Sequence, residues 1–277
     1  MMTSHAVRRA LLALAVSVVA ATLLARAQSP AGQFQPEVGQ EGKDVVWVPT
    51  AHAVVDKMLE MANVTPRDYV IDLGSGDGRT VIAAAKRGAR ALGIEYNPDM
   101  VALSKRNAGI DGVSDRATFV QADIFESDFS QATVVTMFLL PNINVKLSPK
   151  LLLLPPGTRI VSNTFNMGEW VPDDTATVQG DCASWCRVLF WLVPARVAGA
   201  WQLGPGTLSL RQEFQVLSGM LSSANGSVPI AGKLRGAEIA FTVGAAQYAG
   251  RVNGTSMDGT VTSGGTTATW SATRTGQ

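Results

Sequence analysis

The spacing of apolar and polar residues changes once along the chain, near residue 195. Between residues 44 and 195, short apolar runs of strand length alternate with segments whose apolar residues recur at helical spacing. This order predicts a parallel, doubly wound α/β sheet, because parallel strands need crossover connections that are usually helical. Over residues 199–277 the helical period is lost. Alternating runs between glycine-rich turns there predict an all-β domain, either a meander or a small barrel.

The same pattern predicts the individual elements. Strands are expected at 69–73, 91–94, 117–121, 132–140 and 158–162. Helices are expected at 54–61, 80–87, 98–107 and 145–154. Two last strands, 175–179 and 187–193, are expected to close the sheet as a hairpin. In the all-β domain, one alternating face is predicted to hold Leu208, Leu210, Phe214 and Val216.

The N-terminal segment has the pattern of an export signal. Two arginines, Arg8-Arg9, precede an uncharged apolar run, and Ala25-Arg26-Ala27 fits the small-x-small cleavage pattern. We therefore predict a signal peptide over residues 1–27, a flexible lead-in over 28–43, and an exported protein of the periplasm or cell envelope. The alternative is an uncleaved N-terminal segment that anchors the protein at a membrane, although the run is shorter than the roughly 20 residues of a typical span.

Composition and charge exclude several classes of protein. The chain has 277 residues, 46% of them apolar, and a formal net charge of +1. It contains no tract of lysine and arginine of the kind that binds nucleic acid. With two cysteines and two histidines, one of them in the predicted signal peptide, a cysteine-rich or histidine-built metal centre is not expected.

A glycine-rich turn follows the first predicted strand of the sheet. The stretch VIDLGSGDGR, residues 70–79, places Gly74, Gly76 and Gly78 between that strand and the next helix. Glycine lets a backbone approach a ligand closely and adopt positive φ. Arg79 stands where the dinucleotide fingerprint G-x-G-x-x-G needs its last glycine, and the phosphate-binding motif G-x-x-x-x-G-K-[ST] is absent. The turn therefore predicts a different nucleotide ligand.

Acidic residues lie at the ends of three successive strands. Asp72 precedes Gly74 by two residues, where a carboxylate suits an ammonium group and repels a pyrophosphate. Glu95 ends the next strand, at the distance at which an acid reaches ribose hydroxyls. Asp123 follows the third strand, where it can accept a hydrogen bond from an adenine amino group. An ammonium, a ribose and an adenine describe S-adenosylmethionine, and its predicted binding residues are Asp72, Gly74, Ser75, Gly76, Gly78, Glu95 and Asp123.

These motifs resemble a known family. The segments WVPT (47–50), DLGSGDGR (72–79), AAAKRGARALGIEYNP (83–98) and FLLPN (138–142) are similar to class I methyltransferases of the mitochondrial protein-lysine methyltransferase group. Members of that group act on the c-subunit of ATP synthase and on the adenine nucleotide translocase. The resemblance covers residues 44–175. It implies an S-adenosylmethionine-dependent enzyme, in a domain spanning 44–195, that methylates lysine of a protein substrate such as a membrane or envelope protein.

The resemblance also implies roles for residues outside the glycine turn. Thr50 is expected near the carboxylate of the cofactor, and Trp47 at the rim of the substrate channel. Many amino-group methyltransferases carry Asn/Asp-Pro-Pro-Tyr after the fourth strand, but this chain, like the family it resembles, lacks that tetrapeptide. The residues at that place, Leu139, Leu140, Pro141 and Asn142, are candidates for lining the channel. No catalytic acid or base is assigned.

Other residues have more than one interpretation. Cys182 and Cys186 flank a short turn and are expected to form a disulfide in an exported protein, with a reduced thiol site as the alternative. His52, at the start of a predicted helix, is more simply a surface or half-buried residue than a proton acceptor. The tryptophans expected to cover the edge of the sheet, or alternatively to line a channel, are Trp170, Trp185 and Trp191.

Two alternative functions stay open. The first is methylation of a small amine, thiol or lipid-like molecule, because fold and cofactor transfer between relatives more readily than substrate does. The second is a non-catalytic exported protein that uses the all-β domain to recognise an envelope partner. An intact glycine turn favours an enzyme over this binding protein.

Overall fold

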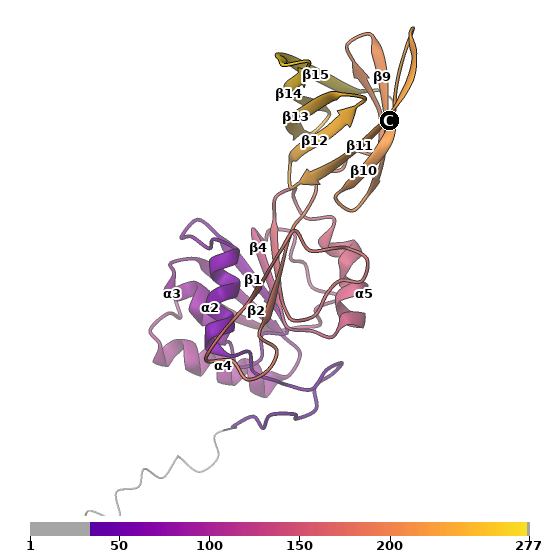
Figure 1. Ribbon diagram of the computed structural model, residues 1–277. Helices are drawn as coiled ribbons and strands as arrows, with labels where there is room; N and C mark the ends of the chain where they lie inside the picture. Colours follow the sequence, from indigo (N-terminus) through magenta and orange to yellow (C-terminus); the bar gives the residue numbers. More distant parts are fainter. Residues whose placement is uncertain (1–33, 276–277) are drawn as a thin grey trace, which may run out of the picture. The chain divides into compact units, whose positions relative to one another are not determined.

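The computed structural model describes residues 34–275 (Figure 1). The predicted signal peptide at 1–27 and the first part of the predicted lead-in, 28–33, lie outside the described residues. Residues 52–192 form a mixed sheet with helices, and residues 199–275 form a closed antiparallel barrel. The predicted fold class is thus confirmed, with a barrel as the form of its all-β part. Within 34–275, no helix is both long and apolar enough to cross a membrane.

Seven strands form the sheet in the order β3-β2-β1-β4-β5-β7-β6. Their bounds are β1 (Tyr69–Leu73), β2 (Arg90–Glu95), β3 (Ala117–Gln121), β4 (Val134–Met137), β5 (Arg159–Asn163), β6 (Asp174–Thr177) and β7 (Arg187–Leu192). The first five run parallel, whereas β7 is antiparallel to both β5 and β6, as the predicted closing hairpin requires. The strand order reverses between β1 and β4. In such sheets, ligands bind beyond the carboxyl ends of the strands at this switch point.

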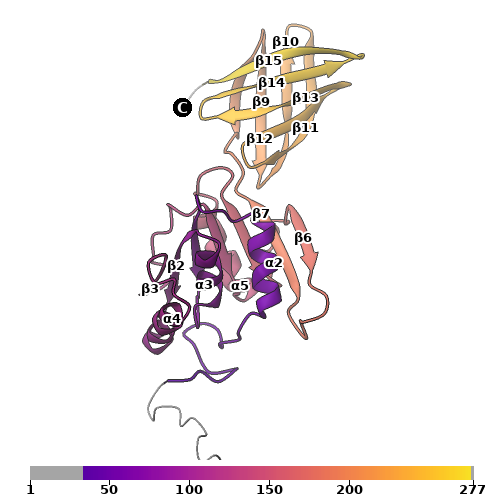
Figure 2. The same cartoon turned by 90° about the vertical axis from the view of Figure 1, so that its left-hand side faces the viewer.

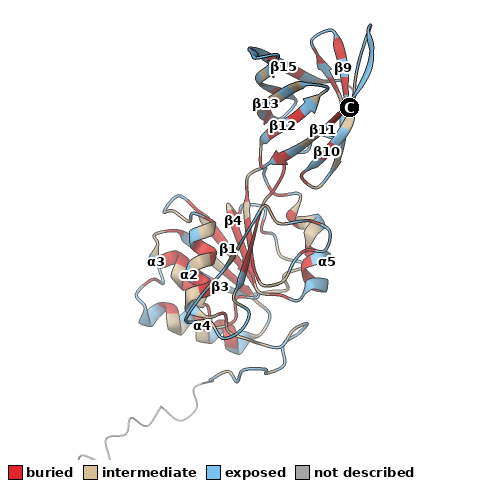
Figure 3. Cartoon of the chain, viewed as in Figure 1, coloured by how far each residue is buried: buried red, intermediate tan, exposed pale blue. Residues whose placement is uncertain are grey.

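Helices cover both faces of the sheet (Figures 1 and 2). One face packs against α2 (His52–Met61), α3 (Arg79–Lys86) and α4 (Pro98–Ile110), and the other against α5 (Pro141–Leu151). Neighbouring strand residues serve opposite faces, so that Val70 packs in the first cluster and Ile71 in the second. The central strands are buried on both sides (Figure 3), which explains their continuous apolar runs in the sequence.

The fourth strand and the helix after it differ from the predicted bounds. β4 ends at Met137, and α5 begins at Pro141, before the helix expected at 145–154. Leu140 is extended (φ −63°, ψ 153°), as residues before proline tend to be. Pro141 then occupies the first helical turn, where its missing N–H removes no hydrogen bond. The predicted strand was too long because hydrophobicity alone does not show where sheet pairing stops.

Eight antiparallel strands form the barrel, which closes in the order β10-β11-β12-β13-β14-β15-β8-β9. Their bounds are β8 (Gly199–Leu203), β9 (Gly206–Glu213), β10 (Val216–Ser223), β11 (Gly226–Arg235), β12 (Glu238–Val243), β13 (Ala246–Asn253), β14 (Ser256–Ser263) and β15 (Thr266–Thr275). Trp201, Phe241 and Trp270 belong to its buried core. Gly250 on β13 leaves room for Trp270, because a Cβ there would lie 2.7 Å from the indole ring. The barrel is therefore filled by side chains.

The apolar face predicted over residues 208–216 is wrong beyond the turn that joins β9 to β10. Leu208 and Leu210 are buried, but Val216 is 56% exposed, and Leu217 is buried in its place. Phe214 lies in the two-residue turn between β9 and β10 with φ +51°, and its ring stacks on Trp170 at a centroid distance of 5.9 Å. The turn shifts the phase of the alternation, which a pattern read straight through it misses.

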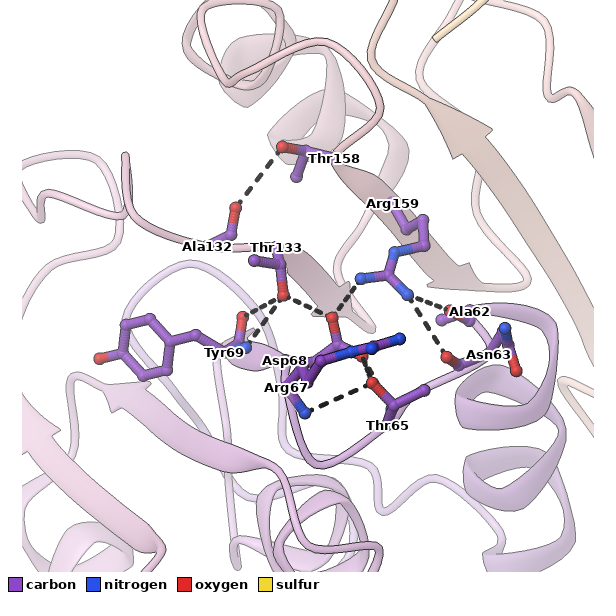
Figure 4. A network of polar contacts seen from close by, with 10 residues as sticks. All are labelled: Ala62, Asn63, Thr65, Arg67, Asp68, Tyr69, Ala132, Thr133, Thr158 and Arg159. Carbon is purple, nitrogen blue, oxygen red and sulfur yellow. Dashed lines mark hydrogen bonds and ion pairs between the residues drawn. The ribbon is translucent and has the colours of Figure 1, made fainter.

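A polar network joins three strands at their amino-terminal ends (Figure 4). The Asp68 carboxylate accepts hydrogen bonds from the Thr65 N–H (2.7 Å) and the Thr133 hydroxyl (2.8 Å), and it pairs with the Arg159 guanidinium. Arg159 also donates to the Ala62 carbonyl at the end of α2 (2.8 Å). Burial alone raises the pKa of Asp68, but hydrogen bonds from Arg159, Thr65 and Thr133 outweigh it and hold that pKa below its usual value. The network thus fastens β1, β4 and β5 to α2.

We expect Arg159→Met to lower the free energy of unfolding by roughly 3 kcal/mol at pH 7, because it leaves a nearly buried carboxylate without its partner. Since the pKa of Asp68 is depressed in the folded state, this stabilisation is present above the ordinary value of 3.8 and is lost as the pH falls below it. Urea denaturation at neutral and acidic pH measures both effects. Lys57→Met, which removes an exposed pair with Glu60, is the control and should cost less than about 0.5 kcal/mol. Equal effects of the two substitutions would contradict the assignment.

Candidate functional site

A cavity lies beyond the carboxyl ends of the parallel strands and encloses about 1020 Å³, its open mouth included. The order β3-β2-β1-β4 places Asp123, Glu95 and Asp72 along this edge, and residues 137–139 follow them on β4 and just after it. The wall on the β1 to β3 side is therefore acidic. On the β4 side it is apolar, because Met137, Phe138 and Leu139 line it.

The glycine turn bends over the end of β1. Gly74, Gly76 and Gly78 have φ values of +75°, +54° and +84°, which L side chains rarely adopt. The N–H groups of Gly74 and Ser75 donate to the Ile94 carbonyl at 2.9 and 3.1 Å, so the turn is tied to β2. Gly74, Ser75 and Gly76 line the cavity.

The structure gives Gly78 a different place from the predicted one. It precedes α3 and is not among the residues that line the cavity. A Cβ at Gly78 would lie 2.8 Å from the Phe119 ring and 2.9 Å from Ser104. Glycine is needed here for close packing of the turn against β3 and α4, rather than for contact with a ligand.

Asp72 is a buried acid at the centre of the cavity wall. Its carboxylate accepts a hydrogen bond from the Thr136 hydroxyl at 2.6 Å, and Thr136 is its register partner on β4. Burial, with smaller contributions from the charges of Glu95 and Asp77, raises the pKa of Asp72 to about 7. A buried carboxylate of this kind gains a partner when a cation binds beside it, so Asp72 fits the ammonium group of an amino acid.

Glu95 connects the glycine turn to the end of β2. One carboxylate oxygen accepts from the Gly76 N–H, and the other accepts from the Asn97 N–H, both at 2.9 Å. Asn97 in turn caps α4 through its side chain. Glu95 lines the cavity with both oxygens already oriented, as expected of an acid that receives the hydroxyl groups of a ribose.

Asp123 lies at the β3 end of the cavity and pairs with Lys43, a residue that sequence reasoning did not single out. The hydrogen bond from Lys43 and the one from the Phe125 N–H hold the pKa of Asp123 below its usual range. The Lys43 ammonium also lies 4.9 Å from the centre of the Tyr96 ring. The sequence around Lys43 is polar and carries no motif, so only the tertiary structure shows its contacts with Asp123 and Tyr96.

The chain segment 40–50 forms one wall of the cavity. Its two ends are held by hydrogen bonds between Gln40 and Trp47, and Trp47 packs over the turn, with its Nε1 2.7 Å from where a Cβ on Gly76 would lie. Thr50 is buried, and its carbonyl accepts from Arg79 at 2.7 Å. Residues 40–43 thus have defined contacts in the structure, whereas the sequence predicted a flexible lead-in over 28–43.

The four residues predicted after β4 are divided by the structure. Leu139 is buried and lines the cavity, whereas Leu140, Pro141 and Asn142 are exposed and do not line it. The early start of α5 turns these three residues outward, and Ile143 returns to the cavity wall one turn later. Of the four, the structure thus places Leu139 alone at the cavity, and a role of the other three in a substrate channel stays a prediction.

The remaining candidates lie elsewhere. His52 is exposed at the start of α2. Cys182 and Cys186 form a disulfide with a Cα–Cα distance of 5.7 Å. Trp170 and Trp191 are fully buried, with the Trp191 indole N–H donating to the Trp170 carbonyl at 2.8 Å, so neither borders a channel. Trp185 alone of the three is open to solvent, at 44% exposure.

The sheet order, the glycine turn and the three acids at successive strand ends define a class I methyltransferase that uses S-adenosylmethionine. Residues 72–174 match the family model described as the ANTKMT methyltransferase domain. A protein-lysine N-methyltransferase from Saccharolobus islandicus is 46% identical over 138 residues, which are 49% of this chain and 86% of that protein. The chain belongs to this methyltransferase family, and the predicted family and cofactor are confirmed.

Two further relatives differ in the substrate that their names give. The adenine nucleotide translocase lysine N-methyltransferase of Mus musculus is 35% identical over 130 residues, which are 46% of this chain and 56% of that protein. The crystal structure of an RNA methyltransferase from Salinibacter ruber in complex with S-adenosyl-L-homocysteine has 49% identity and a TM-score of 0.51. That match covers 54% of this chain and 96% of the other. The matches to these three proteins therefore each concern about half of the chain.

We expect the affinity for S-adenosylmethionine to fall below pH 7. A bound ammonium favours the ionised carboxylate of Asp72, whose pKa is about 7, so protonation competes with binding as the pH falls. Calorimetric titration should show up to about tenfold weaker binding for each pH unit below 7, with proton release near neutrality. Asp72→Asn should bind weakly at every pH, and Asp115→Asn, an exposed control, should behave as wild type. An affinity independent of pH between 5 and 8 would contradict this role.

Proposed function

We propose that the enzyme transfers a methyl group from S-adenosylmethionine to the ε-amino group of a lysine in a protein substrate. The main support is the 46% identity to a protein-lysine N-methyltransferase across most of that protein's length. The apolar wall of the cavity on the β4 side agrees with a lysine acceptor, since a long aliphatic side chain can be buried there.

The residues of the acidic side would hold the cofactor. Asp72 binds the ammonium group of its methionine part, the turn at Gly74 to Gly76 approaches it through the backbone, Glu95 binds the ribose hydroxyls, and Asp123 lies at the adenine. Thr50, from the opposite wall, is near the carboxylate. The burial of Asp72 and the preset orientation of Glu95 support these assignments.

When bound, S-adenosylmethionine supplies an electrophilic methyl carbon attached to a sulfonium, which is a good leaving group. The protein therefore needs to position the acceptor and to keep it unprotonated. Burial among Met137, Phe138 and Leu139 disfavours the ammonium form of a lysine and lowers its pKa. A neutral amine held here would present its lone pair for the methyl group, and the proton that the methylated amine gives up would leave to solvent. No single acid or base is assigned to this step.

Protein is favoured over RNA as the substrate by the charges at the cavity. Among the described residues that line it, the basic side chains are Lys43 and Arg79. Lys43 pairs with Asp123, and Arg79 pairs with Asp77 at 2.6 Å. Both charges are thus already compensated, whereas binding of a nucleic-acid backbone draws on basic groups free to contact phosphates.

We also propose that the enzyme works outside the cytosol, in the periplasm or cell envelope, on a membrane or envelope protein. The Cys182–Cys186 disulfide supports this location, because disulfides persist in oxidising compartments and are rare in the cytosol. The export signal predicted from the sequence agrees with it, with a membrane-anchored form of the same enzyme as the alternative.

Wild-type protein incubated with methyl-labelled S-adenosylmethionine and a membrane fraction should place the label in protein, and acid hydrolysis should release it as Nε-methylated lysine. Asp72→Asn should reduce the rate at least about tenfold, because a charged hydrogen-bond partner of the cofactor is lost. Asp115→Asn should not change the rate. Label that is sensitive to nuclease rather than protease, or that is found in a small molecule, would contradict the proposal.

A further inference from the structure

Three aromatic side chains lie together beside the apolar wall of the cavity. Phe138 lines the cavity, stacks on Phe165 at a centroid distance of 5.8 Å, and packs edge-to-face with Trp185 at a centroid distance of 6.1 Å. Phe138 and Phe165 follow the carboxyl ends of β4 and β5. Trp185 precedes β7, which is antiparallel and so begins at the same sheet edge. In this group, here called the aromatic cluster, Phe138 belongs to the cavity wall, and Phe165 and Trp185 contact it on the side away from the acids.

Buried polar groups hold the backbone of Phe165 in place. Its carbonyl accepts from the Ser162 hydroxyl at 2.7 Å and from the Asn144 side-chain amide at 3.1 Å. Both Ser162 and Asn144 are fully buried. The backbone that carries the ring is therefore fixed to β5 and α5, and the stacked pair of phenylalanines forms a rigid platform.

Trp185 is held in a different way. It is 44% exposed and has φ +53°, a left-handed conformation that bulky residues rarely adopt. The Cys182–Cys186 disulfide closes a small ring that contains Trp185, and the Cys186 carbonyl accepts from the Val178 N–H at 2.8 Å. The disulfide thus restrains the backbone next to Trp185, while much of the indole surface stays open to solvent.

We propose that the aromatic cluster receives the lysine side chain of the protein substrate and that the disulfide-closed ring keeps Trp185 in place for it. The proposal rests on the lysine acceptor proposed above. Aromatic faces attract ammonium groups, methylated ones included, and their edges pack against an aliphatic stem. The cluster is suited to this acceptor because it adjoins the apolar wall, carries no competing charge, and presents Trp185 to an arriving chain.

A binding experiment tests the cluster without turnover. Full-length protein with S-adenosylhomocysteine is titrated with Nα-acetyl-Nε-trimethyl-lysine amide, and separately with its neutral isostere, in which carbon replaces the charged nitrogen. The indole N–H resonance of Trp185, identified from its loss in Trp185→Phe, reports binding. We expect the cation to bind about threefold more tightly than the isostere. Trp185→Phe should keep most of this preference, and Trp185→Ala should lose it. Because these variants lack the Trp185 indole, their binding is followed through the other resonances that shift. Ile110→Ala, an exposed control, should keep the preference.

Kinetics test the link to the disulfide. With lysine as the labelled acceptor, Trp185→Ala should raise the KM for the protein substrate several-fold while the affinity for S-adenosylmethionine stays within twofold of wild type. The double substitution Cys182→Ser, Cys186→Ser should also raise this KM several-fold and leave the affinity for S-adenosylmethionine unchanged within twofold. If the disulfide acts through Trp185, combining all three substitutions should add little to either effect. Fully additive effects would overturn the role of the disulfide.

The two proposals fail in different assays. Wild-type enzyme that places no label in lysine contradicts the proposed function. Equal binding of the trimethylated compound and its isostere by wild type, or an undiminished preference in Trp185→Ala, overturns the role of the aromatic cluster whatever the methylation assay shows.

Discussion

The buried carboxylate of Asp72 is the constraint on which the arrangement of the site depends. Its hydrogen bond to Thr136 joins β1 to β4 across the switch point of the sheet. Burial raises its pKa, so the folded protein without ligand keeps an acid in a place where ionisation is unfavourable. The glycine turn must pass directly over this group to bring a ligand to it, which requires positive φ at Gly74 and Gly76. Glu95 then fixes the turn from β2.

The order of the strands separates the acidic part of the site from its apolar part. Asp123 and Glu95 lie on one side of Asp72 along the sheet edge, and the apolar residues after β4 lie on the other. A cofactor rich in polar groups and an acceptor with an aliphatic stem can therefore meet end to end near β1. An in-line transfer needs such an approach from opposite sides, so this arrangement along the sheet edge supports the proposed function.

Several contacts at the site join residues that are far apart in the sequence. Lys43 reaches Asp123, and Trp47 covers Gly76, from a segment whose composition predicted only a flexible lead-in. Likewise, Phe138 meets Phe165 and Trp185 because β5 and β7 are neighbours in the sheet. No local spacing predicts these pairs, since each depends on which strands are adjacent and on the direction in which each one runs.

By itself, the sequence determined the fold class, the glycine turn and the acids at three successive strand ends, because these depend on local periodicity and on short motifs that precede assembly. It also predicted the cofactor, since the acids and glycines occur in the order expected for its ammonium, ribose and adenine parts. Only the tertiary structure decided that Gly78 serves packing, that Leu140 faces outward and that Trp185 contacts Phe138 of the cavity wall. Those outcomes depend on where pairing stops, where a helix begins and which elements pack together, and these are properties of the assembled chain.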